Sequence, residues 1–444
     1  MSLAGRRTTE LGLLVLGTMF VVGAYLLATL PADSEIPTTV GPFLGIIVGL
    51  PLLAHVAVRR LAPQADGMLL PLASLLNGLG YVFIVRLDEG RPSGPRGLAG
   101  LQSVWMILGV AAFIATLMVV RDARPLERYR YTAGLIGLLL LLLPLIPIVG
   151  REINGSRIWV SFGPVNFQPG EFAKLALALF FAGYLVEKRE LLAINRAFGP
   201  IALPDPKHLG PVLIAWGVAL VVMILEKDLG SSLLFFTLFL VLIWVATERA
   251  SYLAVGVLMF AAGGFLAFST FGHVQERFDT WLDPWGKDKG FQVIQAAFAF
   301  ADGGALGTGL NLGVPYKIPV VESDMIFAAI GEELGLVGAA AVLIAFLLMI
   351  GAGLRIAQQT DSGFERLLAT GLTTLLGFQA FIIMAGVVRL LPLTGVTLPF
   401  MSYGGSSLLA NWVLLALLLR ISSDSAEREA ERAAAGQATE VGAT

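Results

Sequence analysis

The stretch MIFAAIGEELGLVGAAAVLIAFLLMIGAGL, residues 325–354, decides the class of fold. Its only ionisable side chains are Glu332 and Glu333, in a segment that is otherwise apolar or small. A helix needs about 20 apolar residues to cross the hydrocarbon core of a bilayer, so this segment predicts a membrane span. A carboxylate, Asp324, stands directly before the point where the span begins.

Comparable apolar runs recur along most of the chain. They predict twelve spans, and the boundary near residues 226–230 could instead belong to one broken helix. The predicted spans are 10–30, 42–58, 67–86, 101–120, 131–149, 169–186, 209–225, 229–246, 250–271, 325–354, 364–391 and 402–421.

The composition agrees with this reading. The chain of 444 residues is 56% hydrophobic and 14% charged, against about 45–50% and 25% for soluble domains. An all-α polytopic membrane protein is therefore predicted. The net charge of −2 gives no basic field for nucleic acid, and the absence of cysteine excludes disulfides, thiolate metal sites and cysteine nucleophiles.

The arginines and lysines predict the orientation. Short cytoplasmic loops collect these residues, and the distribution places both termini in the cytoplasm. The polar tail at 422–444 is predicted to be a disordered cytoplasmic extension.

Three loops gather most of the polar chemistry. The segments 150–168 and 272–323 are predicted to lie outside and carry aromatics, glycines and charges, and functional groups commonly sit on such loops. The segment 391–407 is rich in glycine, proline and hydroxyl groups, so it is expected to line a cavity or re-enter the membrane.

Several charged residues are candidates for chemistry. Glu171 and Lys174 share a helix face, and ionisable groups within membranes mark functional sites, although a structural ion pair is the alternative. Arg157 suits phosphate binding or an interfacial anchor. Asp324 could act chemically or only cap its helix. Without nucleotide-loop, zinc or serine-elbow motifs, chemistry falls to carboxylates, lysine and arginine. No cofactor is assigned, and a divalent cation such as Mg or Mn is an open alternative.

The region from about residue 67 to 421 resembles the SEDS (shape, elongation, division and sporulation) family of bacterial membrane proteins, which includes RodA, FtsW and SpoVE. Six stretches carry the resemblance in the right order. They are residues 154–159, 167–174, 226–232, 322–328, 331–335 and 398–407.

The resemblance implies a ten-span core at 63–421, preceded by a two-span extension at 1–62 that looks like elongation-type members from actinobacteria. It implies a peptidoglycan glycosyltransferase of the bacterial plasma membrane. Such an enzyme polymerises lipid II on the outer face through β-1,4 linkages and releases undecaprenyl diphosphate. A class B penicillin-binding protein, other elongation or division proteins and the lipid bilayer would be its partners, without nucleic acid.

The resemblance also assigns roles to residues. Asp324 aligns with the family's essential aspartate, the expected general base. The expected substrate-binding residues are Arg157, Glu171, Lys174, Asp228, Ser402 and Ser406.

The chain departs from the family pattern at Gly170, Val320, Glu322 and Ile383. Glu322 would raise the pKa of Asp324 by repulsion. A lipid II flippase and a non-catalytic scaffold remain the alternative functions, and the choice among elongation, division and sporulation stays open.

Overall fold

The computed structural model describes residues 3–29, 40–90, 94–153, 155–162, 165–193, 195–198, 201–204, 217, 221, 225–286 and 290–442. The predicted span at 209–225 lies almost wholly outside these residues. The helices of the described part are α1 Leu3–Thr29, α2 Val40–Leu61, α3 Leu69–Glu89, α4 Leu98–Val119, α5 Arg130–Leu142, α6 Gly170–Ala193, α8 Leu229–Thr247, α9 Ala250–Thr270, α10 Gly272–Leu282, α11 Phe291–Gly303, α12 Ile326–Gln359, α13 Gly363–Val387 and α14 Gly405–Gly442.

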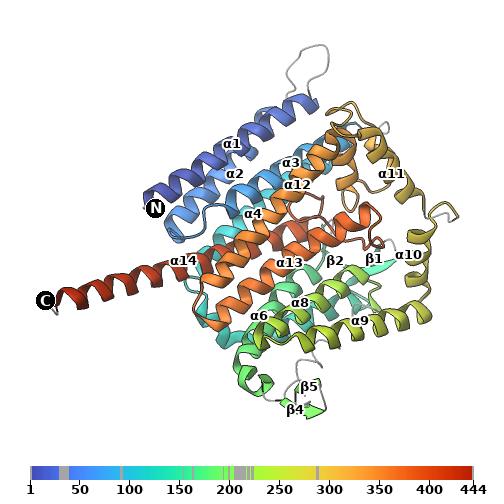
Figure 1. Cartoon of the computed structure of the whole chain (residues 1–444). Coiled ribbons are helices and arrows are strands. Elements are labelled where there is room, and N and C mark those ends of the chain that lie inside the picture. The colour runs from blue at the N-terminus through green and yellow to red at the C-terminus, as the bar shows by residue number, and fades with distance from the viewer. Residues whose placement is uncertain are drawn as a thin grey trace.

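The prediction of an all-α polytopic membrane protein is confirmed. Within the described residues, ten helices are long and apolar enough to cross a membrane. They coincide with ten of the predicted spans, and the charged helix α6 occupies the predicted span at 169–186. The start of α1 and the end of α14 lie on the same side of the molecule, and α10 and α11 lie on the opposite side (Figure 1).

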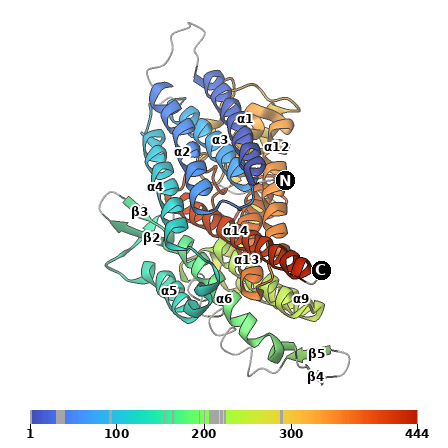
Figure 2. The same cartoon turned by 90° about the vertical axis from the view of Figure 1, so that its left-hand side faces the viewer.

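The two N-terminal helices pack on one edge of the bundle (Figure 2). Helix α1 lies against α3, and α2 lies against α4. Gly78 permits the close approach of α1, because a Cβ at this position would lie 2.8 Å from a methyl of Val21. Tyr25, Phe43 and Tyr81 stack in one row, with ring centroids 3.5 and 5.5 Å apart.

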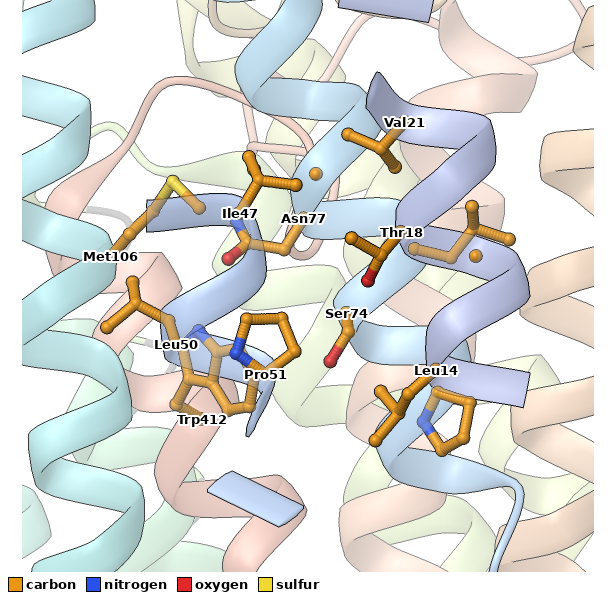
Figure 3. Close-up of a pocket in the computed structure, with 14 residues that line it drawn as sticks. Leu14, Thr18, Val21, Ile47, Leu50, Pro51, Ser74, Asn77, Met106 and Trp412 are labelled. Atoms are coloured by element: carbon orange, nitrogen blue, oxygen red, sulfur yellow. The ribbon is translucent and has the colours of Figure 1, made fainter. Parts of the chain in front are cut away.

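A small cavity of about 20 Å³ remains between this extension and the core (Figure 3). Thr18, Ile47, Asn77 and Trp412 are among its lining residues and come from four different helices. The volume is close to the minimum that one water molecule needs. The extension is therefore packed tightly against the core.

The predicted loop at 150–168 contains a small antiparallel sheet. Its strands are β1 Gly150–Ile153, β2 Ser156–Phe162 and β3 Val165–Phe167, in the order β1-β2-β3. Val160 of β2 is paired with Gly150 of β1 and with Phe167 of β3. A second hairpin joins β4 Asn195–Phe198 to β5 Ile201–Pro204. These strands are minor additions to a helical protein.

Helix α12 is broken near its start. Gly335 has φ +65° and ψ −167°, a conformation that interrupts the helix. The loop after α11 fills the break: the amides of Thr308 and Gly309 donate to the carbonyls of Glu332 and Glu333 at 2.9 and 3.0 Å. Backbone groups at membrane depth require such partners. The start of α12 is therefore fixed to α11.

The tail predicted at 422–444 coincides over residues 422–442 with the last part of helix α14. Helix α14 continues without interruption from the membrane span to Gly442. The tail is rich in alanine, glutamate and arginine, which favour helix. Arg428 binds Glu365 at 2.5 Å, and Arg432 pairs with Asp361. These ion pairs hold the first part of the C-terminal tail against the start of α13.

Candidate active site

A cavity of about 500 Å³ opens at the end of the bundle opposite the termini. Helix α10, the tip of the β1–β2 hairpin and the segment that follows α13 form its walls. Leu391, Leu393 and Gly395 line it, in agreement with the expectation that the segment 391–407 borders a cavity. Its ionisable lining residues are Lys227, His273, Glu276, Arg277, Asp324 and Arg389.

Asp324 lies in the short loop directly before α12 and lines this cavity. The hydroxyl of Ser323 donates to Oδ1 of Asp324 at 3.1 Å. Two further bonds fix the backbone of the loop: Ser402 Oγ donates to the Ser323 carbonyl, and the Tyr403 amide donates to the Glu322 carbonyl at 2.8 Å. Ser402 therefore supports the loop that carries Asp324.

The environment of Asp324 suits a proton acceptor. Burial raises the pKa of its carboxyl, while its own backbone amide, Ser323 and Arg277 oppose that rise. Glu322 raises it further, as expected, but contributes less than burial. A carboxylate with an elevated pKa is a stronger base than one in water.

Basic groups surround the rest of the cavity, and the sequence did not single them out. Arg277 Nη1 donates to the Leu393 carbonyl at 2.7 Å. Arg389 and Trp281 exchange two hydrogen bonds of 3.0 Å, which join α10 to the chain after α13. Burial, with Arg277 and then Lys227, lowers the pKa of His273. The three- and four-residue spacing of charges on α10 was the available signal.

The hairpin of β1 and β2 reaches the cavity through Gly155 and Ser156. The backbone amide of Arg157 donates to the Glu226 carbonyl at 3.1 Å, which attaches the hairpin to the chain before α8. Burial, with some help from Asp228, raises the pKa of Glu226 to about 9. Lys227 therefore lines this end of the cavity, and the neighbouring Glu226 carboxyl is neutral at pH 7.

Asp228 caps helix α8. Its Oδ1 accepts from the Ser231 amide at 3.0 Å, and its Oδ2 accepts from the Ser231 hydroxyl at 2.5 Å. An N-cap carboxylate satisfies amides that would otherwise lack partners. The cap also fixes the chain next to Lys227, which has a positive φ of 61°.

Glu171 and Lys174 do not line the cavity. They form a buried pair with Nζ and Oε2 2.8 Å apart. The ammonium also donates to Oε1 of Gln379 in α13 at 2.7 Å. Ser406, near the start of α14, accepts a hydrogen bond at 2.9 Å from the backbone amide of Gln168, close to the start of α6. The predicted residues therefore fall into two regions, with Asp324 in the cavity and the charge pair inside the bundle.

One carboxylate cluster in the described residues has metal-like spacing. Oxygens of Asp122, Glu365 and Asp424 lie within 4.8 Å of one another. Arg428 binds Glu365 and lies 3.8 Å from Asp122, and Arg420 lies 3.5 Å from Asp424. None of the three carboxylates lines the cavity. Arginines therefore offset this cluster's charge.

The chain has relatives among known proteins. Residues 67–427 match the cell cycle protein family of FtsW, RodA and SpoVE. The chain belongs to this family, and the match begins after α1 and α2.

Among its relatives are RodA proteins from mycobacteria. The peptidoglycan glycosyltransferase RodA of Mycobacterium tuberculosis is 44% identical over 426 residues, which cover 94% of this chain and 90% of that protein. The RodA of Mycobacterium leprae is 44% identical over 430 residues, with the same coverage. A probable peptidoglycan glycosyltransferase FtsW of Geobacter metallireducens is 33% identical over 326 residues, 72% of this chain and 84% of that protein.

Solved structures agree with the sequence relatives. A chain from a peptidoglycan synthase complex that coordinates polymerization and crosslinking gives a TM-score of 0.67 at 28% identity, covering 81% of this chain and 98% of that one. The Thermus thermophilus rod shape determining protein RodA gives 0.58 at 27% identity, covering 81% and 97%.

Proposed function

We propose that this chain is a peptidoglycan glycosyltransferase that joins lipid II disaccharides through β-1,4 linkages during cell elongation and shape maintenance. The observation that carries the proposal is the partly buried Asp324 carboxylate in a cavity lined by Lys227, Arg277 and Arg389. The activity named for the 44% identical RodA relatives supports the same conclusion.

The reaction needs a base and stabilisation of a diphosphate. Asp324 accepts the proton of the acceptor's 4-hydroxyl, and the resulting oxygen attacks the anomeric carbon of the donor. The bond from that carbon to the diphosphate oxygen breaks, and undecaprenyl diphosphate leaves with the electron pair. The cations of the cavity offset the negative charge that builds on the leaving group. Burial of Asp324 supports its role, because its pKa is raised.

The residues that the resemblance assigns to substrate binding differ in the contacts that they make. Ser402 supports the Asp324 loop, whereas Arg157 and Asp228 hold the chain beside the cavity. Direct contact of Lys174 with the diphosphate remains a prediction, since its ammonium is bound to Glu171 and Gln379. The assay below tests whether polymerisation depends on Mg or Mn.

The decisive assay uses full-length purified protein in detergent or vesicles with labelled lipid II. Glycan ladders on a gel, formed with and without added divalent cation, are the expected product. The Asp324→Asn variant is the matched control and should give none. Movement of lipid II across the vesicle membrane without polymer would favour a flippase, and neither polymer nor movement would favour a scaffold.

We further propose that a class B penicillin-binding protein is the partner. The support is the likeness to a chain from a peptidoglycan synthase complex. Co-purification of the two membrane proteins, and a higher polymerisation rate in the complex, are expected. Equal rates with and without the transpeptidase would argue against a functional partnership.

The cavity is proposed to face outward, with both termini in the cytoplasm. The cavity lies at one end of the bundle and both termini lie at the other, which supports this orientation. Because the chain has no cysteine, one introduced cysteine reports one site. Glu152→Cys, at an exposed position of β1, should react with a membrane-impermeant thiol reagent in spheroplasts, and Gln358→Cys should not. The reverse pattern would place the cavity in the wrong leaflet for this reaction.

A further inference from the structure

Gln379 of α13 hydrogen-bonds both to the buried charge pair of α6 and to the segment that follows α13. Its side chain is 2% exposed. Oε1 accepts from the Lys174 ammonium at 2.7 Å, and Nε2 donates to the Thr397 carbonyl at 2.8 Å. Nε2 also lies 3.5 Å from the hydroxyl of Ser407. Both ends of the amide are therefore used, one on the charge pair and the other on the segment after α13.

That segment leads directly to the catalytic loop. Five residues beyond Thr397, Ser402 accepts from the Leu398 amide at 2.8 Å and donates to the Ser323 carbonyl. The neighbouring Tyr403 amide binds the Glu322 carbonyl. Asn77 of α3 holds the same turn from the other side by donating to the Phe400 carbonyl at 3.0 Å. The backbone before Asp324 thus depends on the position of residues 397–403.

We propose that Gln379 is a positioning residue for the reaction: it uses the buried Glu171–Lys174 pair to fix residues 397–403, and through Ser402 it sets the place of Asp324. The inference rests on the proposed role of Asp324 as the base. A buried amide is suited to this work, because leaving either of its groups without a partner is costly. Small displacements of a base reduce rates strongly, by about 10²-fold for 1 Å.

The test is the Gln379→Met variant of the full-length protein, measured with lipid II. Methionine is similar in length and apolar, so the two hydrogen bonds are lost with little change in volume. The kcat per folded protein should fall about 10- to 100-fold, while KM stays within about twofold of the wild-type value. KM is spared because the cavity cations that hold the diphosphate are unchanged.

The dependence of kcat on pH gives a second readout. Burial raises the pKa of Asp324, and a looser loop lets water reach the carboxyl. The acid limb of the profile should therefore move to lower pH in Gln379→Met. The charged groups that act on Asp324, Arg277 and Glu322, are the same in both proteins.

Two variants serve as controls. Gln102 in α4 is also fully buried, and its side-chain atoms have no hydrogen-bond partner in the described part of the chain. Gln102→Met therefore repeats the chemical change away from residues 397–403 and should keep kcat. Gln379→Glu retains an acceptor for Lys174 but removes the donor to Thr397, so it should share the low kcat of Gln379→Met.

A double-mutant cycle with Ser402→Ala completes the test. If both residues act on Asp324 through one segment, their effects on kcat are less than additive. Additive effects, an unmoved acid limb or a wild-type kcat in Gln379→Met would overturn the proposal. Absence of polymerisation by the wild type would overturn the proposed function itself, so the two failures are distinguishable.

Discussion

The cavity at Asp324 and the buried pair of Glu171 and Lys174 contain the same kinds of side chain but use them differently. The cavity has a volume of about 500 Å³. Among the described residues, its cationic side chains still have N–H groups without an acceptor, although Arg277 donates one bond to the Leu393 carbonyl. The pair is 5–6% exposed, and its ammonium binds both a carboxylate and an amide. Charge within a membrane protein thus marks importance, while the remaining hydrogen-bonding capacity separates a binding site from a structural support.

Among the variants of the two regions, replacing Asp324 should lower the polymerisation rate most. Asp324→Asn preserves shape but cannot accept a proton, so polymerisation should fall by about 10²–10⁴-fold, with normal membrane abundance. The rate on labelled lipid II and the amount of folded protein are measured together. Wild-type rates would remove Asp324 from the mechanism, and a parallel loss of protein would restore the alternative that it only caps α12.

Arg277 tests the cationic side of the cavity. Arg277→Met should lower kcat by about 10²–10³-fold, as expected for loss of a group that stabilises developing charge. Arg277 lowers the pKa of Asp324, so its removal should raise that pKa further. Because the base must be ionised, the acid limb of the rate profile should then move to higher pH. An acid limb that does not move would show that the guanidinium does not act on Asp324.

The buried pair should respond mainly in stability. Lys174→Ala leaves the Glu171 carboxylate buried without its cation, at a cost of about 3–5 kcal/mol. Glu171→Gln should lose stability for the reciprocal reason. An apolar double variant, Glu171→Leu with Lys174→Met, should regain membrane abundance but not full kcat, because Gln379 then lacks a partner. A raised KM for lipid II at normal abundance in Lys174→Ala would instead support direct contact with the diphosphate.

The cap at Asp228 should give the smallest effect. Asp228→Ala removes two acceptors from the first turn of α8 and should cost about 0.5–2 kcal/mol. Asp228→Ser, which retains a capping oxygen, should restore most of the loss. Thermal unfolding in detergent measures both variants. A large fall in activity at unchanged stability would show that this carboxylate contacts substrate.

The spans could be predicted from the sequence, and Asp324 was proposed as the base, for different reasons. Hydropathy is a local property, so the positions of α3, α12 and α13 follow from the residues within them. Asp324 was found through a resemblance, since its burial against the Ser402 turn depends on residues far away in the chain. The substrate role that the resemblance assigns to Lys174 stays a prediction, because sequence similarity does not show which way a charged side chain points.

The parts that sequence missed are tertiary. Arg277 enters the cavity because α10 is bonded to the chain after α13, a contact that no local pattern reports. Gln379 was overlooked as one polar residue in an apolar span, although such residues often make interhelical hydrogen bonds.

The uninterrupted helix α14 has a mechanical consequence. Its 38 residues give a rod about 57 Å long at 1.5 Å per residue, nearly twice the thickness of a hydrocarbon core of about 30 Å. It begins beside the turn that contains Ser402 and projects beyond the bundle at its other end (Figure 1). No proline interrupts it, so one continuous rod links the projecting end to the turn that supports the Asp324 loop.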